Sequence, residues 1–263
     1  MTSDEKIEIL TKRQYLVVKS NELIQKNRFE LSLPEQKTVA FICSMIQPID
    51  PKDSIYNVPF QLEYEFNIRN YCKICGIDYD NGKNYINIKA LLKKLSDRSM
   101  WLETETGEVL CRWLSKVWTN KRSGIAKIRI DEDLAPYLFD LKEKFTQYQL
   151  YNVLAMKSAF SVRMYELMKS YAFQKSKVFD LDELKRLLMI DNVKSYTRYP
   201  DFRRKVLEKA QKEINKLTDL EMSFEPITKG RKVVKIKFII RKKDIAGCMA
   251  SEQTTHDYLG SLE

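Results

Sequence analysis

The chain has 263 residues, of which 46 are Lys or Arg, 36 are Asp or Glu and one is His. Its hydrophobic content of 44% excludes wholesale disorder and suffices for one large domain or two ordinary ones. No stretch reaches the roughly 18 consecutive apolar residues of a membrane span, and the N-terminal residues lack a secretion signal, so we expect a cytoplasmic protein.

The residue types that enzymes use are scarce. The one histidine, His256, stands near the C-terminus, and the seven glycines form neither a GxGxxG nor a GxxxxGK[ST] phosphate-binding loop. Cys72 and Cys75 form one CxxC pair, for which a zinc site or a redox pair is the alternative to simple burial. Because no second pair exists and both lie in a helical pattern, we interpret them as small buried side chains. We predict no catalytic residue, no metal site and no cofactor.

The first third of the chain shows three local signals. Residues 15–18 are apolar and suit a strand or an extended arm. Ser32 and Glu35 have the spacing of a capping box, which predicts a helix that Pro48 ends. A short helix stopped by glycine is expected over 66–76.

The next segment changes from helical to alternating periodicity. A polar link over 78–83 leads to a third helix, Asn84–Asp97, whose apolar residues share one face. Alternating stretches then predict strands over 99–103, 109–119 and 125–130, joined by turns at 105–107 and 121–124. Three helices followed by hairpins is the order of a winged helix, a helix-turn-helix variant with a β-hairpin wing.

The second half repeats this order after a join that we place in residues 131–145, which include Pro136. The predicted elements are a long helix over 150–171, a shorter helix capped at 180–183 and ending near Ile190, a helix over Asp201–Thr218, and strands over 222–226 and 233–240 around a basic turn at 228–232.

Local residue matches support an internal repeat. Lys94–Asp97 (KLSD) corresponds to Lys216–Asp219 (KLTD) at the end of each third helix. The same alignment pairs Met100 with Met222 and Leu102 with Phe224. Phe66-x-Ile68 likewise resembles Phe179-x-Leu181 at the start of the preceding helix. We predict an α+β fold of two tandem winged-helix domains, residues 1–140 and 141–245. The tail, 246–263, has no periodic pattern, and we expect it to be flexible.

The excess positive charge is concentrated in one segment. Residues 194–243 hold sixteen Lys or Arg and six Asp or Glu, a net charge of +10 that equals the net charge of the whole chain. A basic helix beside a basic hairpin tip is typical of a nucleic-acid-binding surface. The alternative is a solvated helix face with ion pairs such as Glu208–Lys212.

The predicted DNA contacts come from both domains. Those of the second domain are Arg198, Tyr199, Arg203, Arg204, Lys205, Gln211 and Lys212, on and just before the helix, and Lys229, Arg231 and Lys232 at the hairpin tip. Arg and Gln can bond to base edges in a major groove, whereas Lys mostly binds phosphates. Those of the first domain are Lys89, Lys93, Lys94, Lys121 and Arg122. Its other hairpin tip, 103–108, is acidic, so this domain either binds DNA more weakly or serves dimerisation.

Several separated motifs resemble those of the iteron-binding plasmid replication initiators. They are Val17–Ile24 (VVKSNELI), Leu31–Lys37 (LSLPEQK), Phe160–Leu167 (FSVRMYEL) and the stretch from Phe202 to Leu220. The likeness covers about residues 12–243, and it implies two tandem winged helices that bind directly repeated sites in double-stranded DNA at a plasmid origin. The long helix of the second domain reads the major groove in that family, a role that falls here on Asp201–Thr218, with Arg203, Arg204 and Lys205 in the matching motif.

The same resemblance implies partners besides DNA. It implies local opening of the origin and recruitment of host replication proteins such as an initiator, a helicase or a primase. It further implies that the first domain touches DNA in monomers and mediates self-association, with dimers acting as autorepressors.

Two other functions fit parts of the sequence. A winged-helix transcriptional regulator without a replication role has the same physics, and a coding position beside directly repeated DNA would separate the two. A nicking initiator of the rolling-circle type needs a tyrosine nucleophile, of which the chain offers fourteen candidates. Such enzymes also use a metal-binding His cluster that this sequence lacks, so we expect a protein that is not an enzyme.

Overall fold

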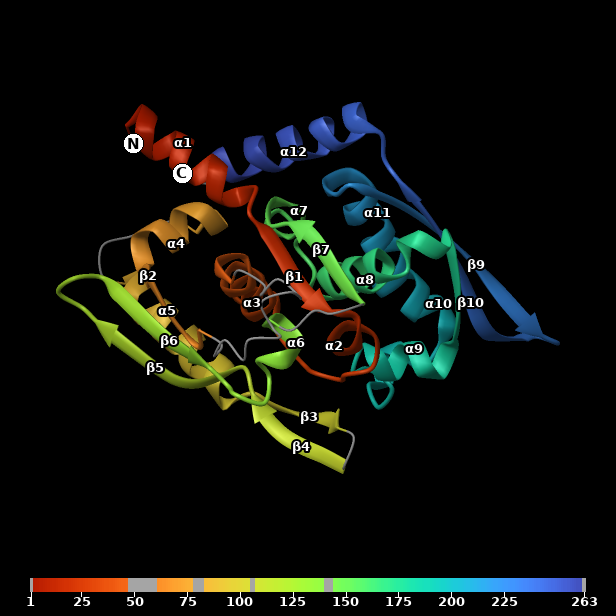
Figure 1. Ribbon diagram of the computed structural model, residues 1–263. Helices are drawn as coiled ribbons and strands as arrows, with labels where there is room; N and C mark the ends of the chain where they lie inside the picture. The colour runs from red at the N-terminus through yellow and green to blue at the C-terminus, as the bar shows by residue number, and fades with distance from the viewer. Residues whose placement is uncertain (1, 47–60, 78–82, 105–106, 140–143, 262–263) are drawn as a thin grey trace.

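Two three-stranded antiparallel sheets stand at opposite ends of the molecule, with helices between them (Figure 1). The structure is a computed structural model that describes residues 2–46, 61–77, 83–104, 107–139 and 144–261. The buried hydrophobic side chains form one connected cluster that reaches both sheets. The two units therefore share a continuous core.

The N-terminal segment consists of three helices and one strand: α1 (Ser3–Arg13), β1 (Leu16–Ser20), α2 (Asn21–Gln25) and α3 (Leu33–Met45). The strand over 15–18 is confirmed, whereas α1 was not predicted. The capping box is confirmed, because the Ser32 backbone N–H donates to the Glu35 carboxylate at 2.6 Å. The predicted helix stop at Pro48 lies outside the described residues.

The first sheet has the order β2-β6-β5, with strands β2 (Glu63–Asn67), β5 (Leu114–Asn120) and β6 (Ile125–Ile130). It carries the helices α4 (Ile68–Cys75) and α5 (Lys83–Asp97). Helix α4 ends at Gly76, whose φ of 64° is the left-handed conformation that glycine adopts without strain. The prediction that the helix begins at Phe66 is wrong, because Phe66 pairs with Ala126 in the sheet.

A separate hairpin projects beyond this sheet, formed by β3 (Ser99–Thr104) and β4 (Gly107–Arg112). The predicted turn at 105–107 lies largely outside the described residues. The predicted single strand over 109–119 is wrong. Trp113 and Leu114 are both buried, which breaks the alternation, and the chain passes there from the hairpin into the first sheet.

The second sheet has the order β8-β10-β9, with strands β8 (Ser176–Asp180), β9 (Leu220–Lys229) and β10 (Lys232–Lys242). Its helices are α9 (Leu181–Leu187), α10 (Tyr199–Phe202), a π-helical turn (Arg203–Leu207) and α11 (Glu208–Leu217). The last three are contiguous, so the predicted helix over Asp201–Thr218 is confirmed, with a wider turn inside it.

The predicted repeat is visible in the strand pairing. Strand β2 leads into α4 at Ile68 as β8 leads into α9 at Leu181, so the match of Phe66-x-Ile68 with Phe179-x-Leu181 is confirmed. The match of Met100 with Met222 is wrong. Met222 pairs with Ile240 in β10, and the corresponding pair in the first sheet is Leu114 with Ile130 in β6. Leu114 and not Met100 occupies this position because the β3–β4 hairpin is inserted after α5.

The segment between the two sheets contains α6 (Pro136–Phe139), β7 (Phe145–Gln149), α7 (Tyr151–Leu154) and α8 (Ala159–Ser170). Strand β7 returns to pair with β1. The prediction of one helix over 150–171 is wrong, because Ser158 is extended and the Lys37 ammonium donates to the Leu154 carbonyl at 2.5 Å. That bond satisfies an acceptor that a continuous helix would use.

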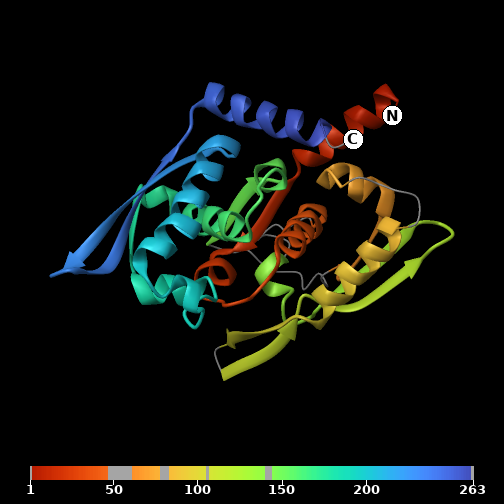
Figure 2. The ribbon, with the colours of Figure 1, turned by 180° about the vertical axis from the view of Figure 1, so that it is seen from behind.

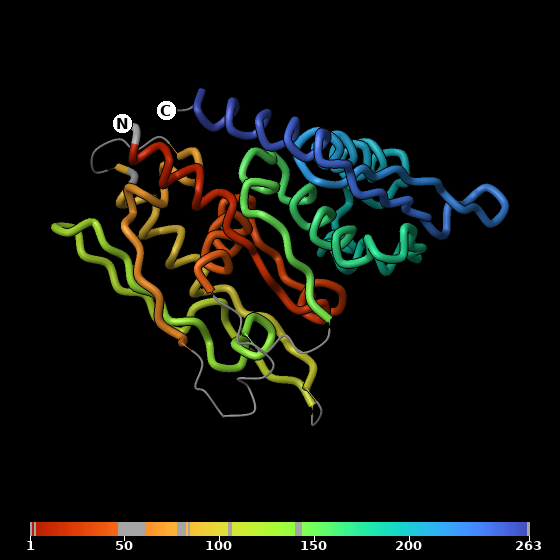
Figure 3. The backbone as a smooth tube through the Cα atoms, turned by 45° about the horizontal axis from the view of Figure 1, so that its top comes forward, coloured from red at the N-terminus to blue at the C-terminus, as the bar shows by residue number. Residues whose placement is uncertain are grey.

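The tail, whose sequence shows no periodic pattern and which was expected to be flexible, forms a helix, α12 (Ile245–Gly260). Its buried stripe is Ser251, Thr255 and Leu259, and two polar members of three hide the apolar period in the sequence. Figure 3 shows α12 running from the end of β10 to a place beside α1. Leu259 packs on Gly76 so closely that a Cβ there would clash. Within the described chain, no helix is long and apolar enough to cross a membrane.

Candidate nucleic-acid interface

The helix from Tyr199 to Leu217 packs its apolar side into the core and presents its other side to solvent. The buried residues are Phe202, Val206, Leu207, Ala210, Ile214 and Leu217, as the sequence predicts. The π-helical turn lies between the two α-helical parts, at the position of the predicted DNA contacts. Such turns are frequent at functional sites because they reorient the side chains that follow.

Two arginines at this turn are exposed and held by carboxylates. Arg203 donates to Glu208 at 2.8 Å, and Arg204 donates to Asp201 at 3.3 Å. The alternative of a solvated helix face predicted an ion pair between Glu208 and Lys212. Glu208 pairs with Arg203 instead. Both contacts are solvent-exposed and therefore weak, so each arginine remains available to an anionic ligand.

The remaining predicted residues of this helix differ in exposure. Lys205 and Lys212 are exposed, and neither has an ion-pair partner among the residues that the structure describes. Gln211 is half-buried and Arg198 is exposed. The prediction that Tyr199 reaches out to DNA is not supported. Its hydroxyl is buried without a hydrogen-bond partner in the described part of the chain, and burial raises its pKa.

The β9–β10 hairpin forms the wing and extends away from the core (Figure 1). Lys229, Arg231 and Lys232 are all exposed at its tip. Gly230 has a φ of 61°, a left-handed conformation that lets the chain reverse within two residues. The tip and the outer face of α11 together present a basic surface, as expected.

The first unit also carries exposed basic residues on a helix and a hairpin tip, but one of them is already held by a carboxylate. Lys89, Lys93 and Lys94 are exposed on α5, although Lys93 is bound to Asp97 at 2.5 Å. Lys121 and Arg122 are exposed at the tip of the β5–β6 hairpin. Figure 2 shows α5 and α11 on the same side of the molecule, with the two hairpin tips at its outer ends. The helices that carry predicted contacts in the two units, α5 and α11, therefore lie on one side of the molecule.

The β3–β4 hairpin has a different chemistry. Glu103 and Glu108 face each other across it and are exposed, which confirms an acidic end. Trp101 and Leu110 are also paired, with exposed fractions of 58% and 52%. This hairpin is unsuited to phosphates.

Three exposed lysines on or next to α11 were not among the predicted DNA contacts. Lys209 and Lys216 lie on the helix, and Lys157 lies in the link between α7 and α8. The lysines of this helix recur at intervals of four, three and four residues, at Lys205, Lys209, Lys212 and Lys216. This spacing places them on one face, so the sequence already contained the signal. Lys157 is brought to them only by the fold.

The chain matches two family descriptions. Residues 16–169 match "Initiator Replication protein, WH1", and residues 180–240 match "Initiator Rep protein, WH2". Our boundary between residues 140 and 141 stays a prediction.

Two relatives come from Escherichia coli. A "Replication initiation protein" is 25% identical over 218 residues, which are 80% of this chain and 65% of that protein. A "PI protein" is 34% identical over 133 residues, 44% of this chain and 43% of that protein. The chain thus spans less than two thirds of the length of each of these relatives.

A solved structure has the same fold. It is described as "Crystal structure of Pi initiator protein in complex with iteron DNA", with a TM-score of 0.65 and 21% sequence identity, covering 88% of this chain and 99% of that one. The predicted α+β fold of two tandem winged helices is confirmed. On these matches the chain belongs to the initiator replication protein family.

Proposed function

We propose that this chain is a plasmid replication initiator that binds directly repeated sites in double-stranded DNA at its origin. The observation that carries the proposal is the basic surface shared by α11 and the β9–β10 tip in a member of this family. The relatives' names and the neighbour bound to iteron DNA support the same role.

In this proposal α11 enters a major groove. Arg204 stands on the exposed face and can form a bidentate bond to a guanine edge, whereas Lys205 and Lys212 bind phosphates. Lys229, Arg231 and Lys232 bind the backbone next to that groove. The α5 face adds a second contact with fewer unpaired cations, so it contributes less to affinity.

The wider role includes opening of the origin, recruitment of a host initiator, helicase or primase, and self-association with autorepression by dimers. The chain acts in the cytoplasm, without a cofactor, and is not an enzyme. Failure to cleave origin DNA in the presence of divalent metal ions supports this last point, and observed cleavage would overturn it.

Footprinting on the DNA that flanks the gene, repeated across salt concentrations, tests the DNA-binding role. We expect protected direct repeats and a steep loss of affinity with salt, because each phosphate contact releases counterions. Arg204→Ala should weaken binding and relax base preference, and Lys205→Ala should weaken binding for all sequences alike. If both variants bind like the wild type, the helix from Tyr199 to Leu217 is not the recognition helix.

The alternative of a transcriptional regulator predicts the same footprint. A plasmid that carries the repeats and lacks its own initiator separates the two. Replication of that plasmid when this chain is supplied supports the initiator role, whereas repression of a promoter without replication supports the regulator.

A further inference from the structure

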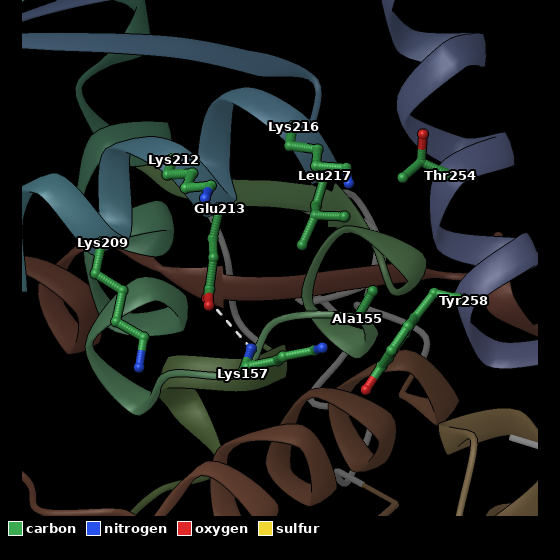
Figure 4. Close-up of a pocket in the computed structure, with 9 residues that line it drawn as sticks. All are labelled: Ala155, Lys157, Lys209, Lys212, Glu213, Lys216, Leu217, Thr254 and Tyr258. Carbon is green, nitrogen blue, oxygen red and sulfur yellow. Dashed lines mark hydrogen bonds between the residues drawn. The ribbon is translucent and has the colours of Figure 1, made fainter. Parts of the chain in front are cut away.

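We propose that the groove between α11, the α7–α8 link and α12 holds phosphates of the bound DNA between the two winged helices. This inference rests on the proposed function and adds a third contact to it. The groove has a volume of about 400 Å³, and four lysines line it: Lys157, Lys209, Lys212 and Lys216 (Figure 4).

The charge of the groove is unbalanced. All four lysines are exposed, and none of them forms an ion pair within the described residues. Among the described residues that line the groove, the one acidic side chain is Glu213, which accepts a hydrogen bond from the Lys157 backbone N–H at 3.2 Å. Four cations around one carboxylate leave a site that favours an anion.

Lys157 is positioned from two sides. The bond to Glu213 ties its backbone to α11, and its ammonium lies 4.7 Å from the centre of the Tyr258 ring on α12. A contact with an aromatic face orders the side chain without cancelling its charge. Lys157 therefore stays able to bind a phosphate oxygen.

The position of the groove favours duplex DNA over a small anion. It lies on the flank of α11 that faces α12 and the α7–α8 link, beside the exposed lysines of the recognition helix. Lys209 and Lys216 are two helical turns apart, about 10 Å. A single strand of B-DNA places phosphates at a rise of about 3.4 Å, so this row can contact more than one of them.

Helix α12 gives the groove a wall that the family descriptions do not include. Tyr258 and Thr254 belong to α12, which lies beyond the matched ranges 16–169 and 180–240. Because α12 also packs on Gly76 of the first unit, it holds the groove between the two units. The C-terminal helix thus becomes part of the DNA-binding surface.

The test uses the full chain and a duplex that carries the footprinted repeats, with affinity measured by fluorescence anisotropy over a salt series. Lys157→Gln and Lys216→Gln should each weaken binding about 3- to 10-fold at 0.1 M salt and reduce the salt slope by about one. Base preference should stay unchanged. Lys6→Gln, on an exposed turn of α1, is the matched control and should bind like the wild type.

The outcomes separate this inference from the proposed function. If the wild type shows no preference for the repeats, the proposed function fails. If the wild type and Arg204→Ala behave as expected but both groove variants keep the wild-type salt slope, only the groove assignment fails. Binding of inorganic phosphate that depends on Lys157, together with an unchanged DNA salt slope, would mark a free-anion site and overturn the assignment.

Discussion

The Lys19 ammonium lies 2.6 Å from a carboxylate oxygen of Glu166, and both side chains are buried, with 5% and 4% exposed. The same oxygen accepts a hydrogen bond from the Tyr148 hydroxyl at 2.5 Å. Lys19 belongs to β1 and Glu166 to α8, so the pair joins two of the motifs that identified the family in the sequence. A buried pair of this kind specifies how β1 and β7 pack on α8.

Removal of one member of this pair should destabilise the fold. Lys19→Met removes the ion-pair partner of the buried Glu166 carboxylate and leaves it only the Tyr148 hydroxyl bond, and breaking such a buried pair costs about 3–5 kcal/mol. The free energy of unfolding in urea measures the loss. The double variant Lys19→Met with Glu166→Leu is the control and should recover much of it. A single variant as stable as the wild type would contradict the buried ion pair.

The same pair makes stability depend on pH. Burial by itself raises the pKa of Glu166. The charge of Lys19 and the hydrogen bonds from Lys19 and Tyr148 outweigh this effect, so the pKa lies below its usual value of 4.5. The group therefore stabilises the fold fully above about pH 4.5, and this contribution is lost as the pH falls through the lowered pKa. Unfolding curves between pH 6 and about pH 3 should show the decline, and Glu166→Gln should flatten it.

Neutralisation of Glu208 should strengthen DNA binding. Glu208→Gln removes a negative charge from the exposed face of α11 and releases Arg203, which donates to the Glu208 carboxylate at 2.8 Å in the wild type. We expect about threefold tighter binding and a salt slope steeper by about one. Glu22→Gln, which frees Lys26 from a similar exposed pair on α2, is the control and should have no effect. Weaker binding of Glu208→Gln would show that Glu208 itself contacts the DNA.

A methyl group at Gly76 should loosen the contact between α4 and α12. Gly76→Ala forces an L-residue into a left-handed φ of 64° and places its Cβ against Leu259. The first effect costs about 1–2 kcal/mol, and the clash adds to it. In a Leu259→Ala background the cost of Gly76→Ala should fall to the backbone part alone. Equal costs in both backgrounds would mean that Leu259 does not touch Gly76.

The CxxC thiols should resist modification in the folded protein. Cys72 and Cys75 are buried, as predicted, and burial raises the pKa of each to about 12. Cys248 is half-buried on α12 and should react first with a thiol reagent at pH 8. Cys248→Ser should remove the fast phase. A fast phase that persists in this variant would contradict the burial of the four remaining thiols, which are Cys43, Cys72, Cys75 and Cys111.

The sequence by itself determined the elements whose signals are local. The Ser32–Glu35 capping box, the stop at Gly76 and the apolar face of Asp201–Thr218 each depend on residues within a few turns of one another, so they could be predicted. The concentration of charge in residues 194–243 predicted which unit presents the stronger basic surface, because exposed lysines on an amphipathic helix must lie opposite its buried face.

Only the tertiary structure decided the features that join distant segments. The pairing of β1 with β7 depends on partners far along the chain, and so does the break at Ser158, where Lys37 binds the Leu154 carbonyl. Helix α12 was missed because its buried residues are Ser251, Thr255 and Leu259, which show no apolar period in the sequence. The elements that bury this stripe come from other parts of the chain, and their positions cannot be read from the sequence. The lysine groove has the same origin, since Lys157 is more than fifty residues from Lys209 and meets it only in the fold.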